Sequence, residues 1–213
     1  MADAPTVAVL DYGLNNVGSV VNMLRRLDVH ATSVPDGRSL VSASAIVLPG
    51  IGAFDAGVRR LRETGLFDAI LEHAQAGVPL LGICLGMQLL SRGSEEGSLS
   101  GLGLVPATTR KLHPPAPSFP IPHMGWNETT CVDRELFRGF ENELPRFYYV
   151  HSYHVVCDDD GDVAARCSYG ETFTAAVRRG NVFGTQFHPE KSHRFGKQVL
   201  ANFLHAVASH ARA

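Results

Sequence analysis

The chain has 213 residues, of which 45% are hydrophobic and 19% charged, and its formal net charge is −2. This composition is typical of a globular protein with a sizeable core, and it excludes an intrinsically disordered chain. The near-balanced charge gives no reason to expect binding to nucleic acid or to an anionic membrane surface. No apolar run is long enough to span a bilayer, and residues 1–6 lack the features of a secretion signal, so we expect a cytoplasmic protein.

The first half of the chain alternates short apolar runs with helical periodicity. The first run ends at Asp-Tyr-Gly, and Asn15 or Asn16 can cap the helix that follows. A later helical stretch is interrupted near Gly65. Alternating strands and helices predict a doubly wound, mostly parallel α/β sheet flanked by helices. We expect strands at 7–10, 45–48 and 80–83, and helices at 17–27, at 54–71 and from 85 to 90.

The second half of the chain is less regular. Residues 91–100 are polar and glycine-rich, and residues 113–122 contain five prolines, so both stretches are expected to be irregular. Further strands are predicted at 147–150, 175–177 and 182–187, and the chain ends in an amphipathic helix. We find no internal repeat and no interdomain linker, and therefore expect one domain over residues 1–213.

Four cysteines occur, without the C-x-x-C spacing that is typical of zinc sites. In a reducing compartment we expect free thiols, with Cys131, Cys157 and Cys167 acting as small apolar fillers. His151 and His154 would face opposite ways on a strand, which argues against a metal site there. No Walker A loop or G-x-G-x-x-G fingerprint is present, and we expect no cofactor.

Cys84 stands apart from the other cysteines because it lies on a turn between a predicted strand and a helix, with Gly82 and Gly86 on either side. This is the pattern of a nucleophile elbow, in which the glycines permit the tight backbone. The following helix N-terminus favours the thiolate, and the Leu85 N–H would face an oxyanion formed on attack. The alternative is a buried cysteine in a glycine-rich turn.

A histidine and a carboxylate lie two residues apart in the sequence Gln-Phe-His-Pro-Glu at 186–190. Pro189 favours an extended backbone at His188, and in an extended chain Glu190 points to the same side as His188. One ring nitrogen could then donate to Glu190 while the other faces a thiol. The alternative is a surface turn with a solvated Glu190.

Sites in open α/β sheets lie beyond the carboxyl ends of the strands, where Cys84 and His188 are both predicted. A third strand ends there in Pro-Gly-Ile-Gly at 49–52, and its Gly50 or Ile51 N–H could be a second oxyanion donor. A thiol, a base and an orienting acid are the parts of a covalent acyl-transfer site.

These three motifs, in this order along nearly the whole chain, resemble those of the class I (triad) glutamine amidotransferases, which implies a flavodoxin-like α/β fold. Residues 11–20, 122–127 (Pro-His-Met-Gly-Trp-Asn) and 147–153, together with Lys191-Ser192, narrow the match. The chain is similar to the glutaminase subunits of imidazole glycerol phosphate synthases. It departs from the usual Asp-Tyr-Gly-x-Gly-Asn at Asn15, and because Asn tolerates the left-handed conformation we expect the turn to persist.

The resemblance implies a reaction and its residues. Cys84 would attack the side-chain amide of L-glutamine, His188 would pass a proton to the leaving ammonia, and Glu190 would hold His188. Water would then hydrolyse the glutamyl thioester. By the same match the glutamine head group would be held by Gln88, by Glu96 and by the backbone of Ser152 and Tyr153, with adjacent Glu95 as the alternative to Glu96.

The same resemblance implies a partner, a cyclase subunit with a (βα)8 barrel, in a heterodimer that makes imidazole glycerol phosphate and an aminoimidazole carboxamide ribotide. The positions matching the interface are Asn16, Met124, Trp126, Tyr148 and Lys191. From the residues alone, Trp126 could equally be a core anchor, and we expect it in a proline-bounded loop. Two alternatives stay open: a sister enzyme supplying ammonia to a barrel that amidates a sugar or other metabolite, and a non-catalytic scaffold.

Overall fold

A computed structural model describes residues 6–40, 43–115 and 117–210, so the expectation for residues 1–5 lies outside it. The central sheet has nine strands in the order β2-β1-β3-β4-β11-β10-β9-β6-β7. Its first five strands pair in parallel and the remaining pairs are antiparallel. The parallel half comprises β2 (His30–Val34), β1 (Thr6–Leu10), β3 (Ala45–Gly50), β4 (Leu80–Cys84) and β11 (Val182–Thr185).

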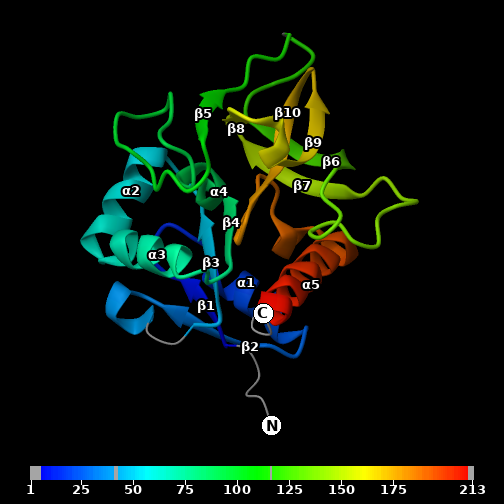
Figure 1. Cartoon of the computed structure of the whole chain (residues 1–213). Helices are drawn as coiled ribbons and strands as arrows, with labels where there is room; N and C mark the ends of the chain where they lie inside the picture. The colour runs from blue at the N-terminus through cyan, green and yellow to red at the C-terminus, as the bar shows by residue number, and fades with distance from the viewer. Residues whose placement is uncertain (1–5, 41–42, 116, 211–213) are drawn as a thin grey trace.

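Helices cover both faces of the parallel half, which confirms the predicted doubly wound α/β fold (Figure 1). The helical stretch from residue 54 is broken at Gly65, whose φ of 71° gives α2 and α3 separate axes. The helices are α1 (Val17–Arg25), α2 (Phe54–Glu63), α3 (Leu66–Gln75), α4 (Leu85–Leu89) and α5 (His193–His210). No helix among the described residues is long and apolar enough to cross a membrane.

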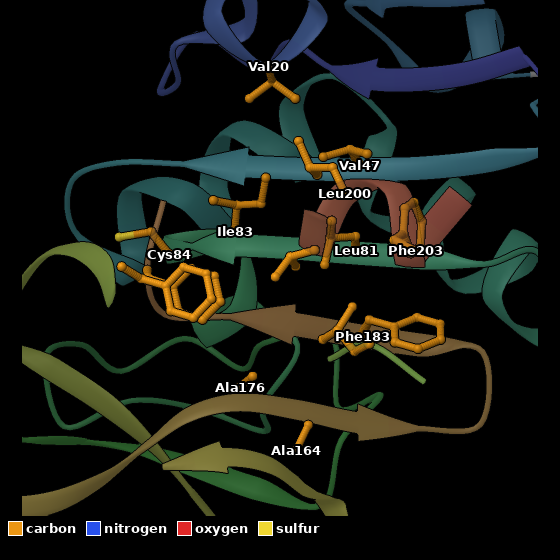
Figure 2. Packing of buried hydrophobic residues seen from close by; sticks show 14 of the residues in the cluster. Val20, Val47, Leu81, Ile83, Cys84, Ala164, Ala176, Phe183, Leu200 and Phe203 are labelled. Carbon is orange, nitrogen blue, oxygen red and sulfur yellow. The ribbon is translucent and has the colours of Figure 1, made fainter. Parts of the chain in front are cut away.

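The parallel strands are apolar on both faces because each face is covered by helices. Val47, Leu81 and Phe183 pack with Val20 of α1 and with residues of α5 such as Phe203 (Figure 2). The alternate residues of the same strands pack in a second core with α2, α3 and α4. This double burial holds β3, β4 and β11 in one register, so their carboxyl ends form a fixed edge.

The antiparallel half was predicted only in part. It comprises β10 (Glu171–Arg179), β9 (Val163–Tyr169), β6 (His123–Cys131) and β7 (Arg146–His151), while β5 (Ala107–Lys111) pairs with β8 (Tyr153–Cys157) in a small second sheet. The expected irregular segment therefore ends at β6. The described residues also form three short 3-10 turns, η1 (Gly37–Leu40), η2 (Asp160–Asp162) and η3 (Pro189–Lys191).

Asn15 and Asn16 behave differently from the sequence expectation. Asn16 is the N-cap residue of α1, but neither its side chain nor that of Asn15 makes a capping hydrogen bond. The Asn15 side chain instead donates to the Leu10 carbonyl at 2.7 Å. Asn15 does not adopt the left-handed conformation that we invoked for it. The turn after β1 is therefore closed by a side-chain hydrogen bond and needs no glycine at residue 15.

Candidate active site

Cys84 occupies a strained turn at the carboxyl end of β4. Its φ of 55° and ψ of −109° lie in a region that L-residues rarely adopt, and α4 begins at the next residue. A Cβ on Gly86 would stand 1.8 Å from the Leu48 carbonyl oxygen, and one on Gly82 would stand 2.7 Å from the Gly86 backbone. Both glycines are thus required by contact between backbones, and the predicted elbow geometry is what the chain adopts.

The Cys84 side chain is almost fully buried and lies at the carboxyl end of β4 (Figure 2). Its sulfur lies 3.8 Å from the Val150 carbonyl oxygen and 3.7 Å from Nε2 of Gln186. The second contact follows from the sheet, because β11 pairs with β4 in parallel with Thr185 opposite Ile83. The next residues along, Cys84 at the end of β4 and Gln186 directly after β11, therefore lie side by side.

His188 and Glu190 form a buried pair, as the sequence predicted. Nδ1 of His188 lies 2.8 Å from Oε1 of Glu190, and each side chain is less than 5% exposed. The local explanation was only half right. His188 is extended, but Glu190 lies in the short 3-10 turn η3, so the turn rather than an extended chain brings the carboxylate to the ring.

Ser192 braces this turn. Its hydroxyl donates to the His188 carbonyl at 2.7 Å and accepts from the Tyr148 N–H at 3.0 Å. The His188 N–H in turn donates to the Tyr148 carbonyl. Since Tyr148 belongs to β7, the histidine is held against the antiparallel half of the sheet while Cys84 is held by the parallel half.

The ring of His188 is poised to be protonated. Burial alone would lower its pKa, but the neighbouring Cys84 and Glu190 more than offset burial and raise the pKa to about 9. Nδ1 is committed to Glu190, and Nε2 makes no hydrogen bond with any described residue. The ring can therefore receive or deliver a proton at Nε2 while the buried carboxylate stabilises its positive charge.

A cavity of about 570 Å³ opens in front of Cys84. That volume suits a small-molecule ligand. The residues that line it include all four that the sequence analysis assigned to substrate binding. The structure therefore places them next to Cys84. The lining residues are Ile51, Gly52, Ala53, Cys84, Leu85, Gln88, Glu96, Pro122, Val150, His151, Ser152 and Tyr153.

The choice between two adjacent acids is decided by their partners. Glu96 lines the cavity and its Oε2 accepts the Phe54 N–H at 2.8 Å, at the start of α2. Glu95 instead accepts the Lys111 N–H at 2.9 Å. Glu96 is therefore the carboxylate placed to meet a cationic group of a ligand.

The second oxyanion donor differs from the expectation in its geometry. Leu85 opens α4, where an N–H has no partner within the helix, and it lines the cavity. The Ile51 N–H, however, donates to the Leu14 carbonyl at 2.8 Å and is not free to face the cavity. Gly50 lies in β3 opposite Cys84.

Several residues at the site were not assigned from the sequence. Gln186 contacts the sulfur, His151 lines the cavity, and Tyr12 is buried with its hydroxyl against Gly50. Burial, with a smaller effect of Cys84, raises the pKa of Tyr12. The one signal available in the sequence was a polar residue, Gln186, directly after an apolar strand.

Some of the predicted interface residues contact one another, and others are single exposed side chains. Trp126 is 39% exposed, on β6 rather than in a loop, and it packs edge-on against Tyr148 at 6.0 Å. Nζ of Lys191 lies over the Tyr148 ring, 5.7 Å from its centroid, and His193, which the sequence analysis did not single out, stacks on Trp126. Met124 is 62% exposed. Trp126 is thus not a core anchor.

No group of three His, Cys, Asp or Glu side chains that could hold a metal ion occurs in the described part of the chain. His151 and His154 are on different strands, and His151 bonds instead to His123 and to the Tyr153 carbonyl. Cys167 is buried, whereas Cys131 and Cys157 are only partly so, and all four cysteines are free thiols.

Comparisons with known proteins agree with this geometry. Residues 8–207 match the sequence profile of the family described as glutamine amidotransferase class-I. Imidazole glycerol phosphate synthase subunit HisH 2 of Methanococcus maripaludis is 43% identical over 199 residues, covering 93% of this chain and 98% of that one. The protein of the same name from Pseudomonas aeruginosa is 43% identical over 203 residues, covering 94% and 100%. The PurLQS structure from Thermotoga maritima superposes with a TM-score of 0.73 at 22% identity, covering 96% and 99%, and shares the fold.

Proposed function

Because the chain belongs to the class I glutamine amidotransferases, and within them to the HisH subunits of imidazole glycerol phosphate synthase, we propose that it is the glutaminase subunit of that enzyme in histidine biosynthesis. It hydrolyses L-glutamine to glutamate and ammonia. The observation that carries the proposal is the strained Cys84 turn, which opens into a cavity lined by Gln88 and Glu96 with the buried His188–Glu190 pair beside it.

The proposed reaction begins with attack of the Cys84 thiolate on the amide carbon of glutamine. The carbonyl oxygen of the substrate gains negative charge and is stabilised by the Leu85 N–H. His188, protonated at Nε2, gives that proton to the departing nitrogen, so the C–N bond breaks and ammonia leaves. Glu190 stabilises the imidazolium throughout, since it holds Nδ1 at 2.8 Å.

The glutamyl thioester is then hydrolysed. His188, now neutral, takes a proton from water, the hydroxide adds to the thioester carbonyl, and glutamate departs with regeneration of the thiolate–imidazolium pair. Glu96 is placed to meet the ammonium of the substrate, and Gln88 with the Ser152–Tyr153 backbone to hold its other polar groups. No metal or cofactor takes part in these steps.

The ammonia is delivered to a cyclase subunit, which we propose to be a (βα)8 barrel docked as a heterodimer in the cytoplasm. Exposed large apolar side chains gather beside the cavity: Ile51 lines it, and Met124 and Trp126 follow the cavity-lining Pro122 on β6. Such a cluster on an otherwise polar surface favours a protein partner. Asn16, Tyr148 and Lys191 complete the proposed interface.

Activation by the partner is part of the proposal. The Ile51 N–H is held by the Leu14 carbonyl, two residues before Asn16. Rotation of the peptide between Gly50 and Ile51 would release this N–H to the oxyanion, and it is eased by the flanking glycines. Crystals of the free and partner-bound protein test this: an oxyanion hole already complete in a free chain of low activity would refute it.

Two measurements test the proposed function. Cys84→Ala must abolish glutamine hydrolysis in the presence of the cyclase and its nucleotide; undiminished hydrolysis would show the mechanism to be wrong. Complementation of a histidine auxotroph that lacks this subunit distinguishes the histidine pathway from a sister enzyme with a different ammonia acceptor. A covalent Cys84 adduct with a glutamine-mimicking electrophile would exclude a non-catalytic scaffold.

A further inference from the structure

Gln186 contacts the Cys84 sulfur but has no part in the reaction derived above. Its side chain is completely buried, and its backbone N–H donates to the Ala175 carbonyl at 2.8 Å. Nε2 lies 3.7 Å from the Cys84 sulfur, and Oε1 accepts from Nε2 of Gln88 at 3.2 Å. This buried amide lies between the Cys84 sulfur and the cavity-lining Gln88, and it is therefore placed to fix the position of either side chain.

The orientation of the Gln186 amide is fixed by its neighbours. Nε2 of Gln88 lies 3.0 Å from the Tyr153 carbonyl oxygen, which can only accept a hydrogen bond. The Gln88 atom that faces it must therefore be the nitrogen. The same nitrogen faces Gln186, so the Gln186 atom that meets it must be the oxygen. Gln186 is then obliged to present its NH₂ group to the sulfur.

The Tyr153 carbonyl that sets this orientation is itself anchored. It also accepts from Nδ1 of His151 at 2.8 Å, and Nε2 of His151 lies 3.1 Å from Nδ1 of His123. Burial lowers the pKa of His123 to about 4 and that of His151 to about 3, so both rings are neutral near pH 7. With Nδ1 of His151 donating, its Nε2 accepts from His123, and every bond has one donor and one acceptor.

The positively charged ring of His188 favours the thiolate, and the buried Tyr12 hydroxyl near it is neutral. Besides these titratable groups, two others compete for the state of the sulfur. The Val150 carbonyl oxygen, 3.8 Å away, can accept only from the S–H and so favours the thiol. The Gln186 N–H donates to the sulfur and so favours the thiolate, because a hydrogen bond to the charged form stabilises that form. Gln186 is completely buried, and Cys84 is almost fully buried where it lines the cavity.

We propose that Gln186 is a positioning residue that holds the Cys84 sulfur in the elbow and stabilises its thiolate by N–H donation, with its amide locked in that orientation by Gln88 and the Tyr153 carbonyl. The proposal deepens the proposed glutaminase function and rests on it for its catalytic meaning. The contact with the sulfur itself can be tested without glutamine.

The test is the pH profile of Cys84 alkylation by iodoacetamide in the full chain, followed by mass spectrometry of the peptide that carries Cys84. Burial raises the pKa of Cys131 and Cys157 to about 12 and that of Cys167 to about 11, so these thiols react slowly below pH 9. Gln186→Leu removes the donor. Gln186→Met keeps the side-chain length and also removes the donor.

The matched control is Asn202→Leu. Asn202 is also a buried amide, which donates to the Leu136 and Arg138 carbonyls and accepts from Gln198, but it lies on α5 and does not contact the sulfur. Its loss should cost stability without moving the alkylation profile. Thermal unfolding of each variant establishes that it is folded.

We expect Gln186→Leu and Gln186→Met each to raise the pH midpoint of Cys84 alkylation by about one unit, the size expected for a hydrogen bond to a charged group. An unchanged midpoint in a folded Gln186→Leu protein overturns the proposal, and Gln186→Met carries the test if Gln186→Leu does not fold. If the midpoint shifts but wild-type protein with the cyclase does not hydrolyse glutamine, the proposed function fails while the role of Gln186 stands.

Discussion

Substitution of Gly86 by alanine isolates the steric requirement of the elbow. The added Cβ would lie 1.8 Å from the Leu48 carbonyl oxygen, more than 1 Å inside the 3.0 Å that real Cβ contacts respect. The oxygen belongs to the backbone of β3, and the Cβ is fixed directly to the backbone of α4, so no rotamer change can relieve the contact. The helix must move away from the strand, and Cys84 moves with it.

The magnitude follows from two opposing effects. Overpacking in a core costs about 1–3 kcal/mol, and a backbone-to-backbone clash belongs at or above the upper end of that range. Alanine recovers about 0.5–1 kcal/mol because Gly86 is helical and not in the left-handed region. We therefore expect Gly86→Ala to destabilise the protein by about 2 kcal/mol or more.

The assay is urea unfolding followed by circular dichroism, with Gly18→Ala as the control. Gly18 lies in α1, and a Cβ there would meet nothing within 4 Å, so alanine should be neutral or stabilise by about 0.5 kcal/mol. Loss of glutamine hydrolysis should accompany the instability of Gly86→Ala. If Gly86→Ala unfolds at the wild-type urea concentration, the reasoning about the elbow is refuted.

Three further predictions concern charge and the interface. Glu190→Gln should lower kcat for glutamine by roughly 100-fold or more with a much smaller change in KM, since it removes the charge that stabilises protonated His188; a steady-state assay with the cyclase checks this, and a wild-type kcat would contradict it. The raised pKa of His188, about 9, stabilises the folded state fully below its unfolded value near 6.5, and this contribution is lost as pH rises towards 9. Melting temperatures between pH 6.5 and 9.5 should therefore fall more steeply in wild type than in Glu190→Gln, and parallel curves would show the pairing to be irrelevant to stability. Trp126→Ala should weaken cyclase binding by about 10- to 100-fold in calorimetry while leaving the melting temperature within a few degrees, because Trp126 is partly exposed; unchanged affinity would remove it from the interface.

The catalytic geometry was predictable where the chemistry is local in sequence. Gly82 and Gly86 indicate the Cys84 turn, because only glycine fits where a strand contacts the helix that directly follows it. The His188–Glu190 pair was also predicted, although through the wrong backbone conformation. Because His188 and Glu190 are only two residues apart, an extended segment and a 3-10 turn both allow the contact.

Features that depend on distant segments could not be predicted. The choice of Glu96 over Glu95 is made by α2, because Asp55 accepts the Ser98 and Leu99 N–H groups and fixes the loop against the helix. The strand β6 escaped prediction for a similar reason. Its side chains alternate regularly between buried and exposed, but Met124 and Trp126 are on the exposed face while the buried positions include His123 and Thr129. These two polar side chains are buried because they hydrogen-bond to His151 and Tyr149 of β7, a distant segment.

The two glycines of the turn at 49–52 serve different purposes, and this bears on how the turn can move. A Cβ on Gly50 would stand 2.3 Å from the Tyr12 hydroxyl and 2.9 Å from Cβ of Leu85, so residue 50 must be glycine for lack of space. Gly52 has open space around it but a φ of 96°, so its requirement is conformational.

Tyr12 is fixed in turn, because Nε of Arg60 donates to its carbonyl at 3.0 Å and its ring is completely buried. The wall behind Gly50 is therefore rigid, and a rotation of the turn must be taken up at the Gly50–Ile51 peptide and at Gly52, which faces the cavity. The Leu14 carbonyl that holds the Ile51 N–H belongs to the same loop as Tyr12 and Asn16. A partner that contacts Asn16 would therefore act on a loop that Arg60 holds in place at Tyr12. We expect the hydrogen bond between the Ile51 N–H and the Leu14 carbonyl to be the contact of that loop that breaks.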